Sequence, residues 1–460
     1  MRYFKARIYL FSLLLLIGLP LLTACESFLD EKPDKQLVIP STLADLQALL
    51  DNYITMNQLS PVGAAETSAD NYYLTYEDWA ALSNESEQRK YIWAPDNLFH
   101  IDYYPNDWNN LFNRVYPANV VLEYIEGIPR NTSNAAEWDR VKGQAHFHRG
   151  QAFLNGAFTW TLAYEAGSAP DTPGMPLRLG IDFNLPSVRA SLEETYTQII
   201  SDLQQAARLL PTTPVHVMRP SRPAAYAMLA RTFLSMGRYA EAGAYADSSL
   251  ALYDRLLDYN TLDPAAAYPF ERFNVEVLHE SAVSTPQPLQ HNVSRIDTAL
   301  FRQYAEDDLR KTLFFQQNPD GSHSFRGNYE GSAALFGGIA TDEVYLMQAE
   351  SRARAGNTEG AMESLNRLLV TRWRTGTFSP YTAATADEAL NLVLQERRKE
   401  LLMRSLRWMD IKRLNREGAA ITLTRVLGDQ VYTLPPGDLR FALPLPEDVI
   451  ELSGMQQNPR

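Results

Sequence analysis

Apolar residues recur three or four positions apart along much of the chain, which is the spacing of one face of an α-helix. The segment 191–211 is a clear case: Ser191 is followed three positions later by Glu194, a capping box, and apolar residues then recur until Pro211 ends the run. The same spacing predicts helices over 41–50, 108–125, 135–164 and 387–416. The chain is therefore expected to be mainly α-helical.

Two segments, 223–252 and 341–371, each predict a helix–turn–helix unit with a glycine at the turn, Gly237 in the first and Gly356 in the second. Counted from that glycine, the matching positions are Tyr226 and Tyr345, Ala230 and Ala349, and Ala242 and Ala361. Small residues where two helices touch are typical of tetratricopeptide-like repeats, although any close antiparallel helix pair favours them too. Because the copies lie far apart in the sequence, we expect a helical platform rather than a continuous solenoid.

The remaining segments are rich in turns. Residues 60–110 and 257–340 show no clear period, and short extended pieces are expected near 431–434 and 441–445. We therefore expect a mainly α fold with tetratricopeptide-like helical repeats, a loop-rich ligand-binding face, a few short strands and a loop-rich insertion near 257–340.

The N-terminus has the pattern of a bacterial lipoprotein leader. Three basic residues precede an apolar run over 8–22, and a helix of that length spans about 22 Å, too little for the roughly 30 Å hydrocarbon core of a bilayer. The run ends in Leu-Thr-Ala before Cys25, as in a lipobox, in which the cysteine receives the lipid. We predict a signal peptide over 1–24, a lipidated tether over 25–40 and one folded domain over 41–460. An ordinary signal peptide or an uncleaved anchor is the alternative.

Composition and motifs narrow the function classes. A formal net charge of −13 repels nucleic-acid backbones, so nucleic acid is not expected as a partner. Cys25 is the single cysteine, which excludes an intrachain disulfide and a cysteine-based metal site. No nucleophile motif, phosphate-binding loop or zinc motif is present. His146 and His148 lie two positions apart on a predicted helix and so face different sides. We expect no metal, no cofactor and no catalytic residue.

The stretch 70–108 is rich in tyrosine and tryptophan interleaved with asparagine and aspartate. Aromatic faces stack on sugar rings, and amide and carboxylate groups hydrogen-bond sugar hydroxyls. The candidate ligand-binding residues are Asp70, Tyr72, Tyr73, Trp79, Trp93 and Asn97. The alternative is that such aromatics fill a core, which we favour for Trp108 because Leu111 and Phe112 follow it.

Charged residues dominate 395–414, where acids and bases alternate around Trp408. We interpret this stretch as a salt-bridged scaffold, since such acids and bases pair and stay ionised; a catalytic cluster is the alternative. Adjacent acids such as Asp307 and Asp308 are expected to be solvated, and they neither support nor exclude a hydrolase.

Several motifs, in this order, resemble the SusD/RagB family of surface lipoproteins from Bacteroidetes. They are CESFLD at 25–30, WNNLF at 108–112, EVYLMQAE at 343–350, ERRKEL at 396–401, RWMDIKR at 407–413 and LPLP at 443–446. The match is closest in the C-terminal half. The glycine that the family carries before its Arg-Trp pair is absent, and Ser405 and Leu406 stand there instead.

The resemblance implies a helical fold with tetratricopeptide-like units and a loop-built ligand face at the outer membrane. Such proteins are not enzymes: they cap a TonB-dependent barrel of the SusC type, capture an oligosaccharide or another nutrient and deliver it. We therefore predict a cell-surface, lipid-anchored nutrient-binding protein that passes an oligosaccharide to such a transporter. Peptide capture, a lipoprotein glycosidase, and a scaffold that binds only protein are the alternatives.

Overall fold

The computed structural model describes residues 40–99 and 106–460, so the predicted leader and Cys25 lie outside the described residues. Contacts divide the chain into residues 1–42 and a second unit, Leu43–Arg460, to which the following description refers. Within the described ranges, no helix combines the length and the apolar character that crossing a bilayer requires.

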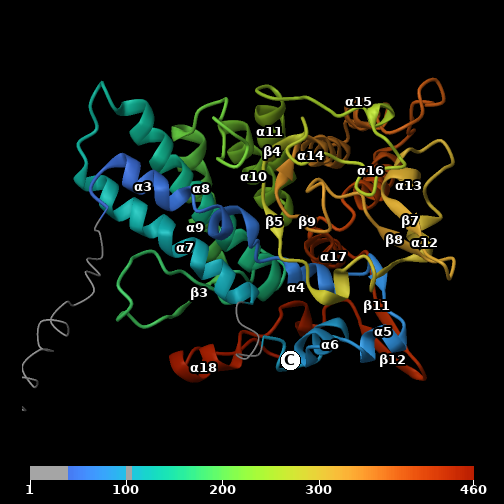
Figure 1. Cartoon of the computed structure of the whole chain (residues 1–460), viewed down its shortest axis with the longest axis horizontal. Coiled ribbons are helices and arrows are strands. Elements are labelled where there is room, and N and C mark those ends of the chain that lie inside the picture. Colours follow the sequence, from blue (N-terminus) through green and yellow to red (C-terminus); the bar gives the residue numbers. More distant parts are fainter. Residues whose placement is uncertain (1–39, 100–105) are drawn as a thin grey trace, which may run out of the picture. The chain divides into compact units, whose positions relative to one another are not determined.

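A row of long helices dominates this unit. They are α7 (Asp107–Tyr124), α8 (Ala135–Trp160), α9 (Leu192–Leu209), α10 (Arg222–Ser235), α11 (Tyr239–Leu250), α14 (Thr341–Arg354), α15 (Thr358–Leu369) and α16 (Ala386–Glu400). From α7 to α15 each helix packs on the next, and α16 packs on both α14 and α15 (Figure 1). The fold is mainly α, as predicted, and its helix pairs are tetratricopeptide-like.

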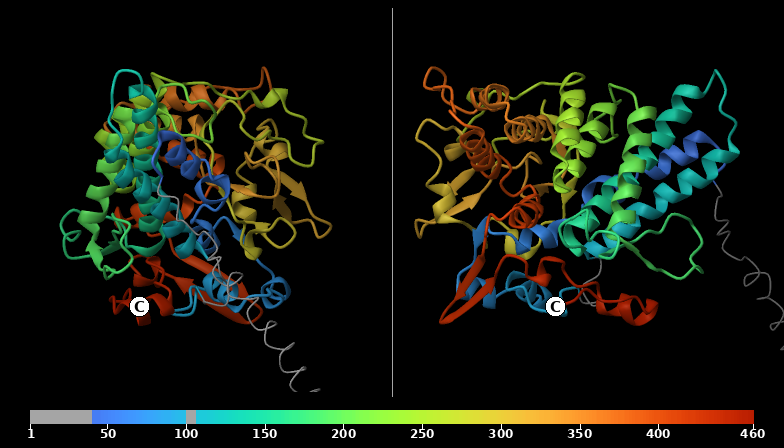
Figure 2. Two further views of the ribbon diagram at one scale, coloured as in Figure 1. Left: turned by 60° about the vertical axis from the view of Figure 1, so that its left-hand side comes forward. Right: turned by 180° about the vertical axis from the view of Figure 1, so that it is seen from behind.

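Both predicted helix–turn–helix units are present. The turn residues Gly237 and Gly356 have φ angles of 74° and 78°, which glycine adopts without a steric penalty. The small residues at the helix contacts are fully buried: Ala230, Ala242, Ala349 and Ala361. However, α11 packs directly on α14, so the helical row is continuous in space, contrary to our expectation. The intervening residues 251–340 leave the row and return to it (Figure 2).

One predicted helix is wrong in its extent. The segment 387–416 forms two helices, α16 and α17 (Arg407–Arg416), separated by a turn. In that turn Met403 and Ser405 have φ angles of 57° and 60°, which end the helical path. The turn buries four apolar side chains that a straight helix would spread around its surface: Leu401, Leu402, Met403 and Leu406. The capping box of α9 is confirmed, because Ser191 Oγ accepts from Glu194 N at 3.1 Å and Glu194 Oε2 accepts from Ser191 N at 2.8 Å.

The other elements are short. The remaining helices are α3 (Leu43–Leu50), α4 (Gly63–Ser68), α5 (Tyr76–Ala80), α6 (Glu85–Tyr91), α12 (Thr298–Phe301), α13 (Arg310–Leu313) and α18 (Glu447–Ser453). The strands form antiparallel pairs: β1 (Tyr72–Tyr73) with β6 (Arg295–Ile296), β2 (Pro173–Pro176) with β3 (Arg189–Ser191), β4 (Val277–His279) with β10 (Ile339–Ala340), β5 (Ala282–Val283) with β9 (Leu335–Phe336), β7 (Phe315–Gln317) with β8 (His323–Phe325), and β11 (Leu423–Leu427) with β12 (Gln430–Leu434). The piece 441–445, which was expected to be extended, forms no strand.

The stretch 257–340 is more ordered than a set of surface loops. It contains β4 to β10 and contributes most of a second hydrophobic core, separate from that of the helical row. This core is rich in aromatic rings, among them Phe270, Phe314, Phe315, Tyr329 and Phe336. The N-terminal segment 53–60 lies against the stretch 257–340, since Ser60 N donates to Ala282 O at 2.9 Å and Asn57 Nδ2 donates to Glu280 O at 2.8 Å. A pocket opens along this contact.

Candidate functional site

Two of the predicted ligand-binding residues are buried in the hydrophobic core. Tyr72 and Trp93 are each only 1% exposed, and they donate to the carbonyl oxygens of Thr67 and Ser68 at 2.8 and 2.9 Å. The guanidinium of Arg425 lies 5.1 Å from the Tyr72 ring centroid and 5.2 Å from that of Trp93. In this conformation neither ring presents a face to a ligand. Trp108 is also buried, as we expected.

Asp70 is held in an ion cluster. Its two carboxylate oxygens lie 2.6 and 3.0 Å from the Arg407 guanidinium, and Arg398 lies 3.2 Å away. Burial alone would raise the pKa of Asp70, but Arg407, Arg398 and the nearby Arg425 lower it to about 2. Its carboxylate therefore joins the β1 region to α16 and α17.

Besides Asp70, three predicted residues keep accessible surface: Tyr73, Trp79 and Asn97. Tyr73 pairs with Arg295 across β1 and β6, and the ring of Trp79 lies 6.1 Å from that of Tyr76. Asn97 has a φ angle of 53°, and its backbone N–H donates to the side chain of Glu447. Tyr73, Trp79 and Asn97 remain predicted ligand contacts.

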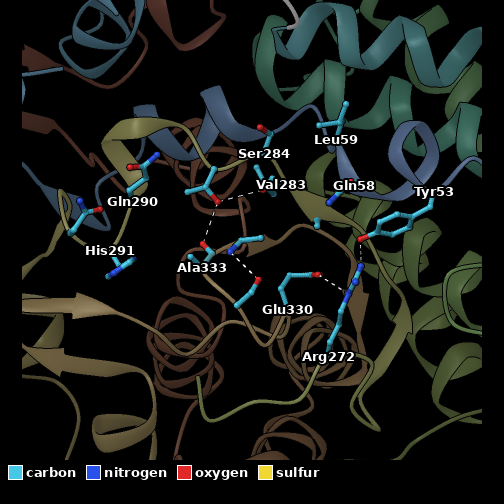
Figure 3. A pocket seen from close by; sticks show the side chains of 15 residues that line it. Tyr53, Gln58, Leu59, Arg272, Val283, Ser284, Gln290, His291, Glu330 and Ala333 are labelled. Carbon is cyan, nitrogen blue, oxygen red and sulfur yellow. Dashed lines mark hydrogen bonds and ion pairs between the residues drawn. The ribbon is translucent and has the colours of Figure 1, made fainter. Parts of the chain in front are cut away.

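The pocket beside β5 has a volume of about 690 Å³, and none of the six predicted residues lines it. Its walls come from the segment before α4, from β5 and the turn after it, and from the turn before β9 (Figure 3). Most of its polar groups are uncharged amides and hydroxyls: Gln58, Ser284, Thr285, Gln290, Asn292 and Ser332. Such groups both donate and accept hydrogen bonds, as sugar hydroxyls do.

One wall of the pocket combines an aromatic ring with charge. The phenol of Tyr53 accepts from Arg272, whose guanidinium also lies 5.1 Å from the Tyr53 ring centroid. Arg272 Nε lies 3.1 Å from Glu330 Oε2, and Arg272 Nη2 lies 2.6 Å from Glu280 Oε1. Figure 3 shows Tyr53, Arg272 and Glu330 side by side on this wall. A half-buried tyrosine ring fixed in this way offers a flat surface on which a sugar ring can stack.

A second, smaller pocket of about 270 Å³ shares Ser284 and Thr285 with the first. Its polar lining includes Asn84, Glu87, Lys90, Asp107 and Asn110. Burial raises the pKa of Asp107 to about 6, although its carboxylate accepts from the backbone N–H of Ala64 at 2.6 Å. Both pockets therefore offer several hydrogen-bonding groups, and the larger pocket has apolar surface beside them.

The sequence contains no local signal for the larger pocket. Tyr53, Arg272 and Glu330 are single residues far apart in the sequence, and the last two lie in the stretch 257–340, which has no clear period. Only the contact between the N-terminal segment and the β5–β9 pair brings the three together. An aromatic-rich stretch such as 70–108 is visible in the sequence, but most of its largest rings pack inward.

Two other sequence interpretations are confirmed. The charged stretch 395–414 is a salt-bridged scaffold: Glu396 and Glu400 bind Arg310, and Asp410 binds Arg397 and Arg413. His146 and His148 face apart, since His146 Nδ1 lies 2.8 Å from Asp202 whereas His148 lies in the core beside His279. Among residues 40–99 and 106–460, no three potential metal-ligating side chains of His, Cys, Asp or Glu form a group that could hold a metal ion.

Comparisons with known proteins agree with this architecture. Solved structures similar to it include a putative sugar binding protein from Bacteroides vulgatus (19% identity, TM-score 0.72, 91% of this chain and 99% of the other). A SusD superfamily protein from Bacteroides thetaiotaomicron has 20% identity and a TM-score of 0.72 over 91% of this chain and 100% of its own. A laminarin binding SusD-like protein has 16% identity and a TM-score of 0.63 over 90% and 98%. At these identities the likeness shows the fold.

A search of curated proteins finds no match. Two family models match the sequence itself. The model described as "Starch-binding associating with outer membrane" matches residues 27–234, and the model described as "SusD family" matches residues 341–458. The two matches together cover more than half of the chain, and the resemblance of the sequence motifs is thereby confirmed: the chain belongs to the SusD/RagB family.

Proposed function

We propose that this chain is a cell-surface glycan-binding lipoprotein that captures an oligosaccharide in the pocket between Tyr53 and β5. The observation that carries the proposal is the pocket's lining, in which uncharged amides and hydroxyls surround one accessible tyrosine ring. This combination suits a ligand with many hydroxyl groups and flat apolar ring faces. The family description as starch-binding supports the same class of ligand.

The proposal is binding without turnover. A glycosidase needs two carboxyl groups on either side of the scissile bond, roughly 5–10 Å apart. At this pocket Glu280 and Glu330 contact each other and the same Arg272 instead, so no sugar ring fits between them. This geometry favours capture over hydrolysis.

Affinity electrophoresis of the full-length chain, purified from membranes in detergent, tests the site. We expect one of a set of glucans, mannans and xylans to retard the protein, and Tyr53→Ala to weaken that binding roughly ten-fold through lost stacking. Tyr73→Ala is the matched control, because it also removes an accessible tyrosine but lies outside the pocket.

The two variants separate the competing sites. Loss of binding in Tyr73→Ala but not in Tyr53→Ala would move the site to the aromatic stretch 70–108. Retardation by peptides and by no glycan would favour peptide capture by the same pocket. Release of shortened sugars would contradict binding without turnover.

The anchor and the partner belong to the same proposal. We infer that lipid on Cys25 holds the protein at the outer membrane, where it delivers its ligand to a TonB-dependent barrel of the SusC type. The family description, "associating with outer membrane", supports the location. Mass spectrometry should find acyl chains on Cys25, and Cys25→Ser should release the protein from membranes. Copurification of a barrel with the wild-type lipoprotein would support the partner, and its absence would contradict it.

A further inference from the structure

The wall of the larger pocket contains a guanidinium already clamped by two carboxyl groups. Arg272 lies between Glu280 and Glu330, at 2.6 and 3.1 Å, and its Nη2 also donates to the phenol of Tyr53. Both carboxyl groups are at least 95% buried, whereas Arg272 is 33% exposed toward the pocket. We call these three residues, Arg272, Glu280 and Glu330, the clamp.

The two carboxyl groups of the clamp also contact each other. One oxygen of each, Glu280 Oε2 and Glu330 Oε1, is buried and accepts no hydrogen bond from another described residue, while the two side chains are within hydrogen-bonding distance of one another. Two carboxylates in contact repel strongly, so a shared proton is the stable arrangement. Burial, with the neighbouring Glu280, raises the pKa of Glu330 to about 8, and burial raises the pKa of Glu280 as well.

The surrounding groups decide which carboxyl group keeps the charge. Glu280 faces a second guanidinium, that of the fully buried Arg114, which stabilises its ionised form. The charged and titratable groups that act on Glu330 are Glu280 and Arg272, and Tyr53 reaches the clamp through Arg272. At neutral pH the clamp therefore holds one guanidinium, one carboxylate and one neutral carboxyl group, and its net charge is zero.

We propose that this pocket selects uncharged oligosaccharides and rejects acidic ones, because the clamp already neutralises its arginine. This inference rests on the proposed capture of a glycan by the same pocket. A free arginine in a binding pocket would receive a sugar carboxylate or sulfate in a bidentate ion pair. In the clamp, Nη2 donates to Glu280 and Tyr53 and the buried Nε lies 3.1 Å from Glu330 Oε2, while Nη1 has no hydrogen bond to the described residues. Nη1 can donate to a hydroxyl oxygen, but an added carboxylate would face two buried acids.

Infrared spectroscopy tests the clamp without a ligand. The carbonyl stretch of one protonated carboxyl group should be present at pH 6 in the difference between the wild-type and Glu330→Gln spectra, and it should be lost as the pH rises through about 8. Other carboxyl groups with a raised pKa, such as Glu66 and Glu276, contribute to both spectra and cancel. Glu271→Gln, which changes an exposed neighbour of Arg272, should show no such difference from the wild-type protein. Absence of this difference band would overturn the shared proton.

Affinity electrophoresis of the full-length chain tests the selection. The probes are neutral polysaccharides (laminarin, amylopectin, galactomannan and xylan) and acidic ones (polygalacturonate and alginate). We expect a neutral probe to retard the wild-type protein and neither acidic probe to do so. The double variant Glu280→Gln, Glu330→Gln leaves Arg272 uncompensated and should gain roughly ten-fold in affinity for an acidic probe.

Each single variant retains one carboxylate for Arg272 and should gain no affinity for the acidic probes. The single variants therefore distinguish an effect of the lost negative charge from an effect of structural damage. Thermal melting checks that every variant is folded. Equal retardation of the wild-type protein by acidic and neutral probes would overturn the inference. If no polysaccharide binds but the infrared difference band is present, the proposed capture of a glycan is wrong, and so is the inferred preference for uncharged oligosaccharides. The shared proton between Glu280 and Glu330 would still be supported.

Discussion

At the scale of single residues, the turn between α16 and α17 shows a side chain in a conformation that favours glycine. Ser405 has a φ angle of 60°, and its buried hydroxyl has no hydrogen-bond partner among the described residues. This is the region where the family's glycine is missing, and the turn forms nonetheless. The buried apolar side chains around it, such as Leu402 and Leu406, compensate for the strain.

Ser405→Gly should therefore stabilise the protein. Glycine removes the steric penalty of the left-handed conformation and an unpaired buried hydroxyl, and the greater freedom of the unfolded chain offsets part of the gain. We expect the free energy of unfolding in urea to rise by about 0.5–1 kcal/mol. Ser235→Gly is the matched control, since Ser235 is equally buried but helical and its hydroxyl donates to Thr232 O at 2.7 Å. That variant should lose stability, and a gain in both would refute the argument.

At the scale of elements, buried ion pairs join α16 to its neighbours. Glu396 and Glu400 lie one helical turn apart, on the face of α16 that meets Arg310, at 2.6 and 2.9 Å. Arg372 then connects Glu400 to Glu276, at 2.8 Å each. Charges removed from water in this way are tolerated only while each has its partner.

Arg310→Met should destabilise the fold by about 3–5 kcal/mol, because it removes the one guanidinium shared by three buried carboxylates and leaves them only partly neutralised by Lys399 and Arg372. Arg367→Met is the control: Arg367 and its partner Asp254 are both more than half exposed, and such surface pairs contribute about 0–1 kcal/mol. Urea unfolding followed by circular dichroism measures both. Similar losses in the two variants would show that burial of the network does not set its contribution.

At the scale of the whole molecule, buried ionisable groups make stability depend on pH in opposing directions. Burial raises the pKa of Glu66 and of Glu276 to about 7. A folded-state pKa above the unfolded value means that the folded protein binds more protons, so stability falls as the pH rises from about 4.5 to 7. Burial lowers the pKa of His148 and His279, so the unfolded protein binds more protons at these histidines. Their contribution therefore makes stability rise with pH below about pH 6.5. A comparison of variants is needed to isolate one group.

Glu66→Gln should make stability less dependent on pH. Relative to the wild-type protein, the variant should gain about 3 kcal/mol between pH 4.5 and pH 7.5, since glutamine has no proton to lose. Scanning calorimetry at constant ionic strength at these two pH values measures the difference. Glu77→Gln, in an exposed position of α5, should show no such gain. An equal pH dependence of Glu66→Gln and the wild-type protein would contradict the assignment.

Much of the fold followed from local patterns in the sequence. Periodic apolar residues, the capping box at Ser191 and the glycines at 237 and 356 each act over a few neighbouring residues, so they predict helices and turns without knowledge of distant contacts. The family motifs, likewise, are short runs of sequence. For the same reason the scaffold role of 395–414 could be inferred from its alternating charges.

Only the tertiary structure decided where the pocket lies and what charge it carries. Tyr53, Arg272 and Glu330 meet because a segment before α4 lies against the β5–β9 pair, a contact between distant residues that no local pattern encodes. The direction of each aromatic side chain was decided in the same way, so Trp93 is buried while Trp79 is not. The physical reason is that a residue's preference for helix, strand or turn depends on its neighbours in the sequence. The burial and the pKa of its side chain depend instead on every group that the folded chain places around it.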